Sequence, residues 1–101
     1  MQPDRSSPNE VGPVLLAGRV ADAIVAAIQK QNAGVRVSWR GSYIRVAVPD
    51  RCEVHSRVVE QILGERFKLL QDLERVMPSF RGRMTLSEDV ASWEAGKPQA
   101  A

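Results

Sequence analysis

The sequence predicts an α+β fold, a small single-domain sandwich of antiparallel hairpins packed against two to three helices. Residues 35–48 alternate between apolar and polar side chains on both sides of Gly41, as in a hairpin with one buried face. Residues 17–31 repeat apolar side chains every three or four positions, as in an amphipathic helix. A hairpin alone is marginal in water, so we expect this helix to cover its apolar face.

In the hairpin, one face of each strand is expected to join the core. The predicted inward residues are Val35, Val37, Trp39, Ile44, Val46 and Val48. Gly41 supplies the positive φ that a tight turn requires. The other face is expected to be exposed to solvent, and it carries Arg36, Ser38, Arg40, Tyr43, Arg45 and Ala47.

The segment before the hairpin predicts a strand and then a helix. Residues 11–16 are apolar with Pro13 near their start, which favours a strand whose early part lies at a sheet edge. The helix over residues 17–31 is expected to end before Gly34, which suits a left-handed conformation. The side chains expected on its buried face are Val20, Ile24, Ala27 and Ile28.

The second half of the chain predicts a turn at residues 49–51 and a helix over residues 57–63. Ser56 is expected to cap that helix and Gly64 to end it. The side chains expected on its inner face are Val58, Val59, Ile62 and Leu63. Further on, we expect a short helix or irregular segment around residues 67–73, an irregular loop over residues 77–82, and a hairpin of residues 83–86 and 90–93 that turns at residues 87–89.

Composition bounds the function. A chain of 101 residues with a net charge of +2 predicts one domain, and it lacks an apolar run long enough to span a membrane. With one cysteine and no signal-peptide pattern, the cytoplasm is the expected location. The polar ends predict a flexible arm over residues 1–10 and a flexible tail over residues 95–101, around a domain of residues 11–94.

A metal or nucleophile site is the first chemical alternative, because Cys52, Glu53 and His55 lie close together in sequence. A metal site requires three or four suitably spaced ligands, and the chain has one histidine and one cysteine. We therefore expect a solvated helix start at this point and no metal. The glycines fall at separate element ends, so no phosphate-binding loop is predicted. The sequence predicts no catalytic, cofactor-binding or metal-binding residues.

A small basic-faced nucleic-acid-binding domain is the second alternative. Arg36, Arg40, Arg45 and Tyr43 could line the outer face of the sheet, as in RNA-binding platforms. The aromatic pattern of an RRM and the GxxG loop of a KH domain are absent. The near balance of 14 basic and 12 acidic residues argues against strong binding to a phosphate backbone. We therefore expect these arginines to lie on a solvent-exposed sheet face.

Five short segments in a fixed order resemble a known family. They are Asn9–Val14, Asn32–Gly34, Tyr43–Val46, Glu60–Phe67 and Ser79–Arg83. Together they are similar to the effector, or coupling, proteins of soluble bacterial multicomponent diiron monooxygenases, the MmoB/DmpM family. The members that oxidise toluene, phenol and alkenes look most alike, because they share the short N-terminal arm and the Asn-x-Val-Gly-Pro-like start.

The resemblance implies a cofactor-free, non-catalytic protein whose partner is the diiron hydroxylase of a hydrocarbon monooxygenase, with no nucleic acid or membrane involved. Such a protein would modulate substrate access, oxygen activation and coupling. The family's docking segment matches Met77, Pro78, Ser79, Phe80, Arg81 and Gly82. An exposed methionine and phenylalanine flanked by arginines would suit an interface. The alternative is that Phe80 packs inward.

Overall fold

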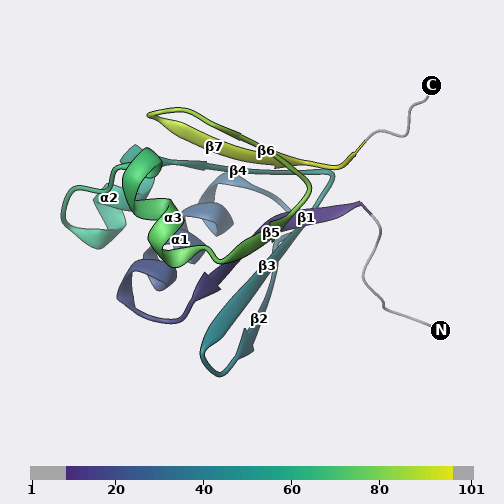
Figure 1. The fold of residues 1–101 in the computed structure, drawn as a ribbon, viewed down its shortest axis with the longest axis horizontal. Helices are drawn as coiled ribbons and strands as arrows, with labels where there is room; N and C mark the ends of the chain where they lie inside the picture. Colours follow the sequence, from purple (N-terminus) through teal and green to yellow (C-terminus); the bar gives the residue numbers. More distant parts are fainter. Residues whose placement is uncertain (1–8, 97–101) are drawn as a thin grey trace.

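The computed structural model describes residues 9–96, which form two antiparallel sheets and a group of helices (Figure 1). The strands are β1 (Glu10–Leu16), β2 (Arg36–Arg40), β3 (Tyr43–Pro49), β4 (Arg51–His55), β5 (Ser79–Arg81), β6 (Arg83–Leu86) and β7 (Val90–Glu94). The helices are α1 (Arg19–Gln31), α2 (Ser56–Leu63), the π-helical turn η1 (Leu69–Leu73) and α3 (Glu74–Val76). No helix within these residues is long and apolar enough to cross a membrane.

The predicted α+β class is confirmed. A four-stranded sheet has the order β2-β3-β1-β5, and a three-stranded sheet has the order β4-β7-β6. Figure 1 shows the sheets approaching each other near the β3–β4 connection, with the helices gathered at the other end of the molecule. Asp50, at a φ of 67°, makes that connection tight, and its backbone bonds to both Asn9 and Ala95.

The β2–β3 hairpin forms as predicted, with a φ of 70° at Gly41. Ile44, Val46 and Val48 are buried, and they pack in one core with α1. The prediction for Trp39 was wrong, because its side chain is 62% exposed. Trp39 lies opposite Ile44 near the hairpin tip, so it has the face that the alternation predicted, but none of residues 9–96 forms a second layer over that end of β2.

Strand β1 is central, which corrects the expectation that Pro13 lies at an edge. It pairs with β3 on one side and β5 on the other. Gly12 and Pro13 fall where the paired positions with β3 are interrupted, between Val11 and Val14. Gly12 has a φ of 144°, and a Cβ there would lie 2.4 Å from the carbonyl oxygen of Val46. The Gly-Pro pair is tolerated because the regular pairing with β3 is interrupted at these two residues, so the missing N–H of Pro13 removes no hydrogen bond of that ladder.

Strand β4 is absent from the prediction, which placed a turn and a solvated helix start there. Cys52 and Val54 are completely buried, while the alternate side chains point outward. The strand is short and charged, and it exists because it pairs along its whole length with β7, which is distant in sequence. Ser56 is consequently the first residue of α2, and no side-chain hydrogen bond caps that helix.

The helices follow the predicted pattern with local differences. α1 begins at Arg19, two residues late, and Gly34 has the predicted positive φ in the turn that follows. In α2 only Val59 is fully buried, and Ile62 is 39% exposed, contrary to prediction. The predicted apolar cluster forms η1, in which Leu69 and Leu73 are buried.

The termini of the described part extend the folded domain slightly. Glu10, expected in an arm over residues 1–10, is buried in β1, while residues 1–8 of that arm lie outside the described residues. Ala95, the first residue of the expected tail, donates a backbone hydrogen bond to Asp50. Residues 97–101 of the tail are also outside the described part.

Candidate protein-interaction surface

The segment predicted to contact a partner, residues 77–82, contains the edge strand β5 and is not an irregular loop. Residues 79–81 pair with Gly12, Pro13 and Val14 of β1. Three residues are too few to show a period in the sequence, and the pairing strand is at the other end of the chain. The segment therefore presents its side chains from a fixed backbone at the border of the four-stranded sheet.

The individual residues of this segment differ in exposure. Met77 is only 9% exposed, so it belongs to the core and is not the exposed anchor that was expected. Pro78, Ser79 and Arg81 are exposed. Phe80 is 40% exposed, which shows that it does not pack fully inward. An exposed aromatic ring on a rigid edge strand is well suited to contact another protein.

Gly82 has a structural reason to be glycine. Its φ is 102°, and a Cβ there would lie 2.7 Å from Cγ1 of Val11 and 2.9 Å from the carbonyl oxygen of Glu94. At this point the chain passes from β5 in one sheet to β6 in the other. Gly82 thus fixes the direction in which β5 leaves the sheet.

A shallow groove beside β5 adds Leu16, which the sequence did not indicate as a surface residue. Leu16 and Tyr43 are paired across β1 and β3, and they are 45% and 41% exposed. Both line the groove together with Arg45 and residues 78–81. Exposed apolar side chains gathered with arginine are typical of protein-binding surfaces. The alternation of β3 had placed Tyr43 outward, but its neighbour Leu16 follows only from the sheet register.

The outer face of the four-stranded sheet holds a second groove, which is basic. It is lined by Arg36, Arg40, Arg45 and Arg81, and the one acidic side chain in its lining is Glu10. Arg36 Nη2 lies 3.4 Å from Oε1 of Glu10, which is 7% exposed. The other three arginines form no ion pair with any residue between 9 and 96.

The structure does not bring Cys52, Glu53 and His55 together as a site. Cys52 points into the core, and burial raises the pKa of its thiol to about 12, so the thiol stays protonated and unreactive. On the opposite face of β4, His55 Nε2 lies 2.6 Å from Oε2 of Glu53. That contact, with Arg51, lowers the pKa of Glu53. Within residues 9–96 no three histidine, cysteine or acidic side chains are grouped as metal ligands would be.

Comparison with known proteins identifies relatives over nearly the whole chain. The model of the MmoB/DmpM family matches residues 9–94. The effector subunit of the alkene monooxygenase system of Xanthobacter autotrophicus (strain ATCC BAA-1158 / Py2) is 39% identical over 92 residues, which cover 89% of this chain and 90% of that protein.

Solved structures share the fold at low sequence identity. A chain from the structure of the phenol hydroxylase–regulatory protein complex matches with a TM-score of 0.75 and 15% identity, over 85% of this chain and 97% of that one. The regulatory protein B of soluble methane monooxygenase matches with a TM-score of 0.66 and 20% identity, over 95% of this chain and 71% of that one.

Proposed function

This chain belongs to the MmoB/DmpM family, and we propose that it is the effector subunit of a multicomponent hydrocarbon monooxygenase, binding the diiron hydroxylase of that system. The observation that carries the proposal is the 39% identity to an alkene monooxygenase effector subunit over nearly the full length of both chains. An alkene is accordingly the favoured substrate of the complete system, ahead of an aromatic hydrocarbon. The proposal includes a cytoplasmic location and no catalytic centre in this chain.

The surface beside β5 supports the proposed docking. Phe80, Leu16 and Tyr43 present apolar area from three adjacent strands of one rigid sheet. Little backbone ordering would be needed on binding, which lowers the entropic penalty of association. Arg45 and Arg81 border this apolar area and supply the polar rim that interfaces favour.

The mechanism follows from differential binding. An effector can shift the hydroxylase between conformations only if it binds one of them more tightly than another. Such coupling is typically about 1 to 3 kcal/mol, which corresponds to about a 5- to 150-fold change. A preference of that size for one conformation is sufficient to change substrate access, oxygen activation and the coupling of electron use to product.

Reconstitution tests the proposal. Adding this protein to its hydroxylase, electron-transfer protein and reductase should raise the product formed per reductant consumed, while the protein alone should form no product. Titration should saturate at a fixed ratio to the hydroxylase. Unchanged turnover and coupling at saturation would show that the protein is not the effector of that system.

A matched pair of variants tests the docking surface. Phe80→Ala should weaken hydroxylase binding by at least about 1 kcal/mol if its ring is an anchor. Ile62→Ala is the control, because Ile62 is exposed to nearly the same extent, 39% against 40%, but lies on α2. Calorimetry gives the affinities, and unfolding midpoints check that both variants are folded. Equal binding by both variants would remove Phe80 from the interface.

A further inference from the structure

The basic groove brings Arg81 together with three arginines of the β2–β3 hairpin. Three strands contribute its arginines: β2 supplies two of them, and β3 and β5 supply one each. The register places Arg45 between Ser38 of β2 and Val14 of β1, and it places Arg81 opposite Gly12. Small side chains and the bare backbone of Gly12 leave a hollow of about 280 Å³ between the guanidinium groups. The hollow is large enough to admit carboxylate side chains.

The charge in the groove is not balanced within the described part of the protein. Four arginines face one carboxylate, and that carboxylate is buried and bound to Arg36. The positive excess here is larger than the formal net charge of +2 for the whole chain, so the remainder is slightly acidic. Like charges held close together repel one another, and an opposing acidic surface would remove that penalty.

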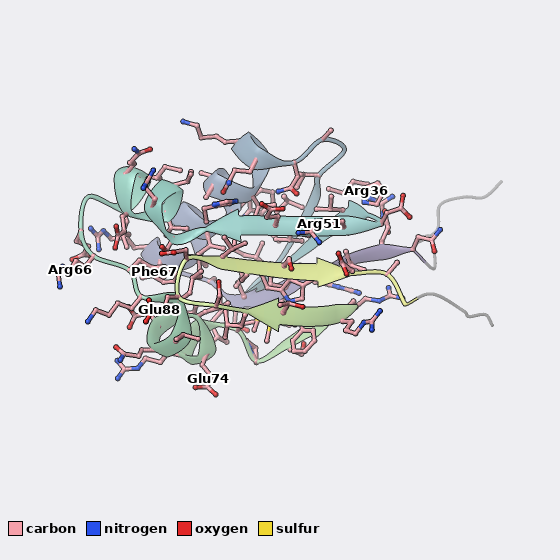
Figure 2. The ribbon with its side chains drawn as sticks, turned by 90° about the horizontal axis from the view of Figure 1, so that it is seen from above. Arg36, Arg51, Arg66, Phe67, Glu74 and Glu88 are labelled. Carbon is pink, nitrogen blue, oxygen red and sulfur yellow. The ribbon has the colours of Figure 1, made fainter. Side chains whose placement is uncertain are left out.

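The basic groove is continuous with the apolar groove beside β5. Val14, Arg45 and Arg81 line both of them, so the two form one surface that runs from the edge strand across the sheet. A partner that covers Phe80 would extend over the arginines. Figure 2 shows Arg36 and Arg66 at opposite ends of the molecule, so basic side chains outside this surface are available for comparison.

We propose that the outer face of the four-stranded sheet is a docking surface for an acidic patch on the hydroxylase. The inference rests on the proposed function and adds the chemistry of the contact. Guanidinium groups form paired, charge-assisted hydrogen bonds with carboxylates, so several arginines in one hollow select a carboxylate-rich partner. The near-neutral charge of the whole chain favours a local acidic patch over a long phosphate backbone as the occupant.

Charge reversal tests the surface. Binding of the wild-type protein to its hydroxylase should weaken as salt rises. Arg45→Glu should weaken binding at low salt by at least about tenfold and should reduce the salt dependence, because it adds repulsion at the centre of the contact. Arg66→Glu, which makes the same charge change at the far end of the molecule, should remain within about twofold. Arg45→Lys retains the charge but cannot form the paired hydrogen bonds, so its affinity should fall between those of the wild-type and Arg45→Glu proteins.

The outcomes separate this inference from the proposed function. Equal hydroxylase affinities for the Arg45→Glu and Arg66→Glu proteins, both folded by their unfolding midpoints, would overturn the acidic contact and leave the effector role intact. An oligonucleotide bound by the wild-type protein and lost in Arg45→Glu, with hydroxylase binding unchanged, would assign the groove to nucleic acid and also overturn the inference. A wild-type protein that does not bind the hydroxylase would overturn both proposals.

Discussion

The outer faces of the two sheets differ in how their charges are satisfied. On the three-stranded sheet, Arg51 pairs with both Glu53 and Glu94, and Glu53 also binds His55. On the four-stranded sheet, the described residues provide one carboxylate for four arginines. The first face satisfies most of its charges through pairs within β4 and between β4 and β7, whereas the other leaves its charge and several apolar side chains available.

The contrast between the two faces indicates which of them would gain from a binding partner. A face whose charges are already paired gains little from a further ionic contact, since the existing pairs would have to be broken. A face with unpaired like charges around exposed apolar groups gains from both burial and neutralisation. The four-stranded sheet is therefore the side on which binding would improve the energy of the molecule.

The two tryptophans make the comparison quantitative. Trp93, on the inner side of the three-stranded sheet, is completely buried, whereas Trp39 at the hairpin tip is 62% exposed. Trp93→Ala should reduce the free energy of unfolding by about 3 to 5 kcal/mol. Trp39→Ala should change it by less than about 0.5 kcal/mol, because little is packed against that ring. Denaturant unfolding of the two variants measures both effects, and similar losses would contradict the asymmetry.

Trp93→Phe refines that test. The indole nitrogen of Trp93 is buried and has no hydrogen-bond partner within the described residues. Phenylalanine removes the unpaired N–H and keeps most of the aromatic area, so it should destabilise the protein less than alanine does. A loss as large as that of Trp93→Ala would show that phenylalanine does not keep the packing of the indole ring at this site.

Substitutions on the inner face of the four-stranded sheet should lower the free energy of unfolding much more than substitutions on its outer face. Ile44 is 1% exposed, and Ile44→Ala should cost roughly 2 to 4 kcal/mol through lost burial and a residual cavity. Its neighbour Tyr43 points outward, so Tyr43→Ala serves as the control. If Ile44→Ala changes the unfolding free energy by less than about 0.5 kcal/mol, Ile44 does not support the core.

Single arginine removals compare the outer faces directly. Arg51→Ala should destabilise the protein by about 0.2 to 1 kcal/mol, because it breaks a cross-strand network at the surface. Arg45→Ala should cause no loss, since Arg45 has no ion pair among the described residues and is surrounded by like charges. Urea unfolding at low salt gives both values. A larger loss for Arg45→Ala would show that its side chain is structurally engaged.

The smallest expected effect is a pH dependence on the three-stranded sheet. Hydrogen bonds from His55 and Arg51 lower the pKa of Glu53 in the folded protein. The stabilisation is therefore complete above the usual carboxylate pKa of about 4.3, and it is lost as pH falls through the lower folded value. Glu53 is a third exposed, so solvent screening limits the effect to a few tenths of a kcal/mol.

Glu53→Gln tests this dependence. The difference in unfolding free energy between wild type and variant should be present at neutral pH and should shrink on acidification below the usual carboxylate range. Glu88→Gln provides the control, because Glu88 lies in the β6–β7 turn and forms no ion pair within residues 9–96. If the difference in unfolding free energy between wild type and Glu53→Gln does not change with pH, the contacts of Glu53 with His55 and Arg51 do not depend on the charge of its carboxylate.

The elements that the sequence predicted correctly are those whose periodicity is long enough to detect. The alternation around Gly41 and the helical spacing of Ile24 and Ile28 predicted the β2–β3 hairpin, α1 and the packing of one on the other. The five ordered segments also indicated the family that the comparison with known proteins identifies. These features depend on residues that are close together in the chain, so the order of side chains in the sequence is sufficient to predict them.

The remaining features depend on contacts between residues that are distant in the chain. β4 and β5 are strands because β7 and β1 pair with them, and no local pattern indicates a partner that is distant in the chain. Trp39 has the alternation of a core residue, yet it lies beyond the layer that would cover it. The basic groove likewise requires the sheet order, which places Arg81 across β1 from Arg45 in the same groove, because strand order and register, and not sequence spacing, determine which charges meet.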